Sequence, residues 1–78
     1  MSKKQIEDCV RSSVEAYLRD LRGIEPDNMH GMILSAVEKP LLEVVMAHTE
    51  NNQSRAAQWL GLNRNTLRKK LLEHKLIK

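Results

Sequence analysis

The stretch from Asn52 to Leu71 constrains the fold more than any other part of this sequence, because it contains the start and stop signals of two helices in close succession. Asn52 and Asn63 are each suited to cap a helix, since an asparagine side-chain oxygen accepts hydrogen bonds from the backbone N–H groups of the first turn. Gly61 follows the last apolar residue of the first helix, where a left-handed backbone closes a helix at no Cβ cost. The stretch therefore predicts two short helices joined by a tight turn.

Small and apolar side chains recur at helical spacing on both predicted helices. The inward-facing residues are Ala56, Ala57, Leu60, Leu62, Leu67 and Leu71. The two alanines let the helices cross closely, and the leucines fill the wedge between them. A capped helix with a polar and basic first turn, braced by a small-residue helix before it, is typical of a helix-turn-helix, whose second helix enters the major groove of DNA. The alternative is an ordinary helical hairpin with a solvated basic face.

The polar residues of this stretch have the chemistry of DNA contacts. Arg64, at the first position of the second helix, can present its planar guanidinium to guanine O6 and N7. Asn63 and Thr66 can reach a base edge or a phosphate. Gln53 and Ser54 begin the first helix, where backbone N–H groups and the helix dipole favour a phosphate.

Charge is distributed unevenly along the sequence. Residues 1–48 carry six basic and eight acidic side chains, for a net charge of −2, whereas residues 49–78 carry seven basic and two acidic ones, for a net charge of +5. A near-neutral segment followed by a basic one is typical of an assembly module joined to a nucleic-acid-binding module. A randomly basic tail is the alternative, but the excess charge coincides with the predicted helix-turn-helix.

Two longer helices are expected before the helix-turn-helix. The first spans Ile6–Arg22 and carries one apolar stripe. The second begins after a cap at Asp27 or Asn28 and runs to about Ala47. It contains Pro40, which removes a backbone hydrogen bond and kinks the helix axis.

The second of these helices is apolar over more than one face. Its apolar residues include Met29, Met32, Ile33, Ala36, Val37, Leu41, Leu42, Val44, Val45 and Met46. A helix that is apolar over so wide an arc must be buried on several sides, which one neighbouring helix cannot achieve. A sequence of 78 residues makes one domain and buries limited apolar area. We therefore expect an obligate oligomer whose core is shared between chains.

The sequence contains none of the residue patterns that are typical of an enzyme. There is no nucleophile–base pair, no phosphate-binding loop and no pair of catalytic carboxylates, so we expect neither an enzyme nor a cofactor. The three histidines lack metal-ligand spacing. Cys9, the single cysteine, forms no intrachain disulfide and is expected to be semi-buried. Trp59 is expected to pack at the junction between the core and the helix-turn-helix.

No apolar run approaches the length of a membrane span, and no signal-peptide pattern opens the sequence. We therefore expect a cytoplasmic protein that does not interact with membranes.

Three segments give the sequence its resemblance to the Fis family, the bacterial nucleoid-associated factors for inversion stimulation. They are Glu38–Met46, Asn52–Ala57 and Gly61–Leu71. The last two are shared more loosely with the DNA-binding domains of NtrC-type activators, whereas the first, with its in-helix proline, singles out Fis. The resemblance extends from about Ile6 to Lys70.

The resemblance implies an all-α fold with four helices per chain in one domain, 1–78. The first two helices (1–48) would interlock with a second copy into a homodimer core, and the last two (49–78) would form the helix-turn-helix. It also implies that the two recognition helices sit closer together than one repeat of straight DNA. The duplex would therefore bend, with loose sequence specificity. The expected function is DNA binding and bending by a nucleoid-associated transcriptional regulator. The alternative is a dimeric helical adaptor that binds a protein.

The resemblance assigns DNA contacts residue by residue. Asn63 and Arg64 would read bases. The other implied contacts, mostly to the DNA backbone, are Asn52, Gln53, Ser54, Arg55, Thr66, Arg68, Lys69 and Lys70.

The sequence also departs from the family. Glu50 stands where the family has a basic residue, so we do not expect contact with RNA polymerase. Because the sequence begins almost at the first helix, we do not expect contact with a DNA invertase either. Asn65 replaces a glycine, and Leu72 and Glu73 replace lysines, so we expect weaker wrapping of flanking DNA and a shallower salt dependence.

Overall fold

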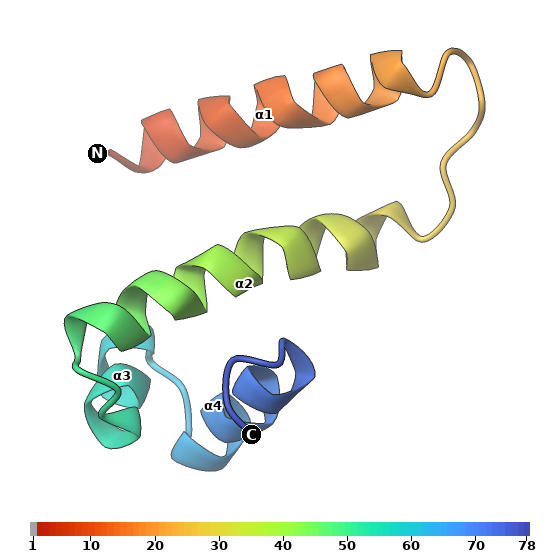
Figure 1. Ribbon diagram of the computed structural model, residues 1–78. Helices are drawn as coiled ribbons and strands as arrows, with labels where there is room; N and C mark the ends of the chain where they lie inside the picture. Colours follow the sequence, from red (N-terminus) through yellow and green to blue (C-terminus); the bar gives the residue numbers. More distant parts are fainter. Residues whose placement is uncertain (1) are drawn as a thin grey trace.

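The computed structural model describes residues 2–78, which form four α-helices and no β-strand. Helix α1 spans Lys3–Asp20, α2 spans Met29–His48, α3 spans Gln53–Leu60 and α4 spans Arg64–Glu73. In Figure 1, α1 and α2 run as two long antiparallel arms, and α3 and α4 gather beneath the C-terminal end of α2. The predicted all-α fold with a C-terminal helix-turn-helix is confirmed.

Helix α1 begins and ends earlier than the predicted Ile6–Arg22. Ser2 and Gln5 form a reciprocal capping box, in which the Gln5 backbone N–H donates to Ser2 Oγ at 3.2 Å and the Ser2 N–H donates to Gln5 Oε1 at 2.6 Å. This cap starts the helix at Lys3. At the other end Arg22 already has a left-handed backbone, with φ of 53°, before Gly23 is reached. The helix therefore stops at Asp20.

Asn28 occupies the N-cap position of α2, as one of the two predicted alternatives, but it does not cap with its side chain. Its backbone is left-handed, with φ of 51°, and the side chain makes no capping hydrogen bond. Its carbonyl oxygen accepts from the Met32 N–H at 3.1 Å instead. The side chain lies over Gly31, where a Cβ would come within 2.9 Å of Asn28 Oδ1. Helix α2 then continues through Pro40, as predicted.

The core lies where the C-terminal half of α2 meets α3 and α4. Its buried residues are Leu42, Met46, Ala56, Ala57, Leu67 and Leu71. Leu67 and Leu71 are completely buried, which confirms that they face inward. Burying a leucine side chain stabilises the fold by about 1.5–3 kcal/mol. Because two of the six residues come from α2, the helix-turn-helix and the end of α2 share one core.

Helix α1 and the outer face of α2 remain uncovered in the single chain. None of the α1 residues is buried. On α2, Leu34, Val37 and Val44 are 53%, 45% and 56% exposed. A groove of about 340 Å³ lies between the two helices and is lined mainly by their apolar side chains. Cys9 was expected to be semi-buried, but it is exposed, because α1 contributes nothing to the core.

Within residues 2–78, no helix has the length and apolarity that crossing a bilayer requires.

Candidate nucleic-acid interface

The turn between α2 and α3 is tightly determined by hydrogen bonds. Thr49 is 1% exposed, and its hydroxyl donates to the Val45 carbonyl at 2.9 Å. Glu50 and Asn51 both adopt left-handed backbones, with φ of 53° and 63°. The Asn51 N–H donates to the Met46 carbonyl at 2.8 Å, which satisfies one of the last carbonyls of α2. The direction in which α3 leaves α2 is therefore set by this turn.

Helix α3 begins at the predicted cap. Asn52 Oδ1 accepts a hydrogen bond from the Arg55 N–H at 3.1 Å. Gln53 is half-buried, whereas Ser54 and Arg55 are exposed. The first turn of α3 carries no acidic residue, so the free N–H groups and the dipole present positive potential to solvent.

The turn between α3 and α4 also follows the prediction. Gly61 has φ of 71° and ends α3. The next N–H, that of Leu62, donates to the Ala57 carbonyl at 2.9 Å, and the Leu62 side chain is half-buried. Asn63 then caps α4, since its Oδ1 accepts from the Asn65 N–H at 2.8 Å. The tight turn of a helix-turn-helix is thus formed by Gly61, Leu62 and Asn63.

Helix α4 separates an apolar face from a polar one. Leu67 and Leu71 are turned into the core. The exposed residues on the first two turns are Arg64, Asn65, Thr66, Arg68 and Lys69. The first turn contains no acidic residue. The outward surface of α4 therefore presents hydrogen-bond donors and positive charge.

The exposed basic side chains of this region are not neutralised within the chain. None of the ion pairs formed by residues 2–78 involves Arg55, Arg64, Arg68 or Lys69. A surface of this kind attracts polyanions, because phosphates can replace the counterions around free cations.

Trp59 was expected to pack at the junction with the core, and this prediction is wrong. The ring is 54% exposed, and the Arg55 guanidinium carbon lies 5.4 Å from its centroid. Residues 55 and 59 are one turn apart and share a face of α3, whereas the buried Ala56 lies on another face. The ring therefore supports the side chain of Arg55 by a cation–π contact instead of filling the core.

Lys70, which the resemblance assigned to the DNA backbone, is turned towards α2. Its Nζ donates to Glu38 Oε2 at 2.8 Å, and His74 Nε2 lies 2.9 Å from Glu38 Oε1. The hydrogen bond from Lys70, reinforced by that from His74, holds the pKa of the Glu38 carboxyl below its ordinary value. The same carboxylate raises the pKa of Lys70. Sequence reasoning missed this cluster because Glu38 lies 32 residues from Lys70 along the chain.

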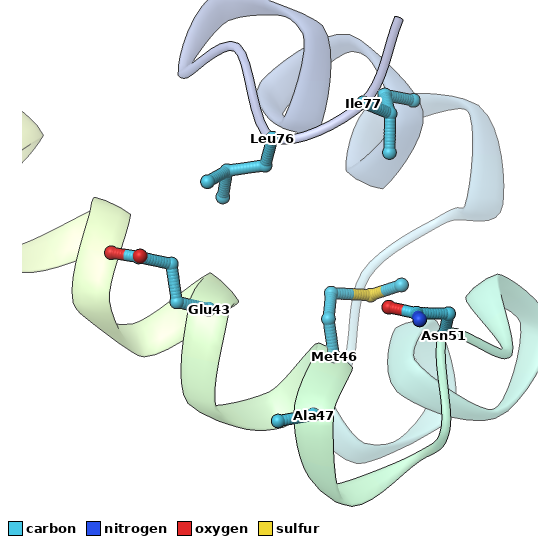
Figure 2. A pocket seen from close by; sticks show the side chains of 6 residues that line it. All are labelled: Glu43, Met46, Ala47, Asn51, Leu76 and Ile77. Carbon is cyan, nitrogen blue, oxygen red and sulfur yellow. The ribbon is translucent and has the colours of Figure 1, made fainter.

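The segment after α4 folds back against α2. Lys75 has φ of 59°, and the Leu76 N–H donates to the Leu71 carbonyl at 2.9 Å. Figure 2 shows Leu76 and Ile77 facing α2 across a hollow of about 340 Å³, which Met46 and neighbouring residues line from the other side. These two side chains pack against the buried core, a contact that the sequence analysis did not anticipate.

The predicted site residues thus fall into two groups. Ten were predicted, and nine of them lie at the helix starts and on the outward surfaces of α3 and α4: Asn52, Gln53, Ser54, Arg55, Asn63, Arg64, Thr66, Arg68 and Lys69. Lys70 is the exception, because its ammonium group is held by α2. Contact of these residues with DNA stays a prediction.

The family profile and the individual relatives that match this chain indicate the same family. The profile of the family described as "Bacterial regulatory protein, Fis family" matches residues 33–74. A Fis-like DNA-binding protein of Ralstonia nicotianae is 56% identical over 77 residues, which cover 99% of this chain and 100% of that protein. A Fis-like DNA-binding protein of Neisseria meningitidis is 53% identical over 72 residues, or 92% of this chain and 91% of the relative. The DNA-binding protein Fis of Psychromonas ingrahamii is 43% identical over 74 residues, or 95% of this chain and 75% of the relative.

Proposed function

From the finding that this chain belongs to the Fis family of bacterial regulatory proteins, we propose that it binds double-stranded DNA through α3 and α4 and regulates transcription. The observation that carries the proposal is the outward surface of α4. Leu67 and Leu71 on its inner side are fully buried. The basic residues Arg64, Arg68 and Lys69 face solvent behind a tight turn and form no ion pair within residues 2–78. We further propose that the protein acts in the cytoplasm on the nucleoid, where its DNA substrate is.

In the proposed complex, α4 enters the major groove and α3 crosses the DNA backbone. Arg64 presents two N–H donors to guanine O6 and N7. Asn63 Oδ1 already accepts from the Asn65 N–H, so its side-chain NH₂ is the group left to donate to a base or a phosphate. The N–H groups at the start of α3, next to Gln53 and Ser54, bind a phosphate and set the register.

We propose that the functional unit is a homodimer in which α1 and α2 of two chains cover one another. The support is the apolar surface that a single chain leaves in water. No α1 residue is buried, and Leu34, Val37, Leu41 and Val44 on α2 are each 45% exposed or more. A second copy is the partner whose own uncovered α1 and α2 match this surface, and closed symmetric dimers are the commonest oligomers.

We propose that the dimer also bends the DNA that it binds. In each chain, α4 shares a core with the end of α2, so the position of α4 depends on where the dimer places α2. The resemblance to the Fis family implies that the dimer holds its two recognition helices at a spacing shorter than one turn of straight DNA. Such a spacing requires the duplex to curve. The cost of bending depends on the sequence that is bent, so preference arises at positions the protein does not touch.

The test is replacement of Arg64 by alanine. On a duplex selected by the wild-type protein from a random-sequence pool, we expect a loss of about 1–3 kcal/mol and relaxed preference for guanine at one position. Fluorescence anisotropy of labelled duplex, measured over a range of salt concentrations, gives the affinities. Arg19→Ala is the matched control, because it removes the same charge from an exposed side chain outside the helix-turn-helix. No binding by the wild-type protein even at low salt would contradict the proposed function.

A further inference from the structure

Glu38 connects the long helix α2 to α4 through both oxygens of its carboxylate. Oε2 accepts from Lys70 Nζ at 2.8 Å, and Oε1 lies 2.9 Å from His74 Nε2. Because an ionised carboxylate only accepts hydrogen bonds, the histidine ring is the donor. Glu73 is the other charged residue that lines the small hollow around this cluster, and the neutral Ser35 lines it as well. We call Glu38, Lys70 and His74 the carboxylate clasp.

The carboxylate clasp is better sheltered than an ordinary surface ion pair. The side chains of Glu38 and Lys70 are 29% and 31% exposed, and that of His74 is 9% exposed. The other ion pair of residues 2–78, Arg11 with Asp8, has side chains that are 64% and 56% exposed. Charge-assisted hydrogen bonds strengthen when water is partly excluded, so the geometry of the clasp is held more firmly than that of an exposed pair.

The clasp supplies directional contacts that the apolar packing of α4 lacks. Leu67 and Leu71 bury α4 against the core, but apolar burial is non-directional, so it opposes a small rotation of the helix about its axis less sharply than aligned hydrogen bonds do. Lys70 lies in the last turn of α4 and His74 is the C-cap residue, four positions later, and both reach one carboxylate. Hydrogen bonds weaken steeply when misaligned, so two bonds to one point resist that rotation.

We propose that the carboxylate clasp sets the orientation of α4 relative to α2, and that Lys70 acts as a positioning residue rather than as a phosphate ligand. A rotation of α4 moves Arg64 at its other end just as it moves Lys70, because a helix turns as one body. The clasp therefore determines whether Arg64 meets a base edge. This inference rests on the proposed function, because it concerns how that site distinguishes one DNA sequence from another.

The alternative for Lys70 is the backbone contact that the family resemblance assigned. To make that contact, Lys70 must break its 2.8 Å hydrogen bond to Glu38, and His74 would then be the one partner of that carboxylate within the cluster. Lys70 would exchange the Glu38 carboxylate for a DNA phosphate, and the partly buried carboxylate would lose one of its two partners. The two roles make different predictions about salt. A phosphate ligand contributes to counterion release, whereas a positioning residue does not.

The experiment compares Glu38→Gln and Lys70→Gln with Glu43→Gln in the full-length chain. Glu43 is an exposed residue of α2 that takes part in no ion pair of residues 2–78, so it controls for the change in charge. Two probes are used: a duplex that the wild-type protein selects from a random-sequence pool, and the unselected pool. Binding is measured by anisotropy over a salt series. Circular dichroism confirms that each variant keeps its helix content.

We expect Glu38→Gln and Lys70→Gln each to lower the preference for the selected duplex over the pool by about two- to thirty-fold, the range typical of substitutions in coupled networks. Glu43→Gln leaves this ratio unchanged. Lys70→Gln leaves the slope of log affinity against log salt unchanged, whereas loss of a phosphate contact would reduce it by about 0.9 per contact. General loss of folding would instead weaken binding to both probes alike.

A reduced salt slope for Lys70→Gln, or equal ratios for Glu38→Gln and Glu43→Gln, would overturn the inference. If Glu38→Gln loses its helix content, His74→Gln replaces it. That variant keeps the Lys70 contact, so it must lower the ratio by a smaller factor, and a wild-type ratio overturns the inference. These outcomes differ from failure of the proposed function, in which the wild-type protein binds neither probe and both proposals fall.

Discussion

Single residues determine where the helices of this chain start and stop. Asn52 and Asn63 each accept a backbone hydrogen bond at the start of a helix, and Gly61 supplies the left-handed residue that ends α3. Apart from Gly61 itself and its two chain neighbours, no residue among those described has an atom within 4 Å of the position that a Cβ on Gly61 would occupy. The requirement for glycine there is therefore conformational and not steric.

Replacing Gly61 by alanine should lower the free energy of unfolding by about 1–2 kcal/mol, because an L-residue pays that amount in the left-handed region. Gly61→Asn should cost less, since asparagine tolerates this conformation better. Urea denaturation followed by circular dichroism, at a fixed protein concentration, measures both. If alanine and asparagine were equally costly, a steric clash would be the better explanation, and the open space around Gly61 argues against one.

At the scale of helices, α4 is attached to α2 by two physically different contacts. The apolar contact of Leu67 and Leu71 is independent of pH, whereas the carboxylate clasp depends on the charge of Glu38. The pKa of Glu38 is lowered from 4.5 by the hydrogen bonds of Lys70 and then His74. A carboxyl group whose pKa is lowered on folding stabilises the folded state above its ordinary pKa. That stabilisation is lost as the pH falls through the lowered value.

We therefore expect the wild-type protein to unfold at a higher urea concentration than Glu38→Gln near neutral pH. The difference between the two urea midpoints should shrink as the pH falls below 4.5. Glutamine does not titrate, so the stability of Glu38→Gln lacks the pH-dependent contribution that the ionised Glu38 carboxylate makes in the wild type. Glu43→Gln, which disturbs no ion pair among residues 2–78, should follow the wild type over the same range. A difference between wild type and Glu38→Gln that is independent of pH would show that the charge of Glu38 does not stabilise the fold.

For the whole molecule, the uncovered apolar surface of α1 and α2 has to be reconciled with stability in water. A lone chain would expose Leu34, Val37 and Val44 and would leave α1 without a single buried residue. Short chains bury too little apolar area to compensate for such a loss. The proposed dimer resolves this problem by making two chains contribute to one core.

Replacing Val37 by aspartate tests the dimer directly. Val37 is 45% exposed in the single chain, so a monomer would tolerate the change within about 0.5 kcal/mol. In the dimer the carboxylate would be buried without a partner, and association and folding should be lost together. Leu72→Asp is the matched control, because Leu72 is 44% exposed but lies on α4. Sedimentation and circular dichroism give the readout, and a folded wild-type monomer at low micromolar concentration would refute the proposal.

Much of the local structure could be predicted because it depends on contacts between residues close in sequence. The caps at Asn52 and Asn63, the end of α3 at Gly61 and the inward faces of Leu67 and Leu71 all follow from residue type and helical spacing. The boundaries of α1 were less exact, because the backbone of Arg22 turned left-handed one residue before the glycine. The placing of most predicted site residues at the helix starts and on the outward surfaces of α3 and α4 follows from the same local rules.

The sequence by itself determined four helices, the caps of α3 and α4 and a basic polar surface on those two helices, because these features need only neighbours one helical turn apart. The tertiary structure decided that Lys70 and His74 meet Glu38, that Leu76 and Ile77 return to the core, and that Trp59 stays in solvent beside Arg55. The first of these joins residues 32 and 36 positions apart. Such pairings depend on how helices pack in space, and neither spacing nor residue type along one chain specifies that packing.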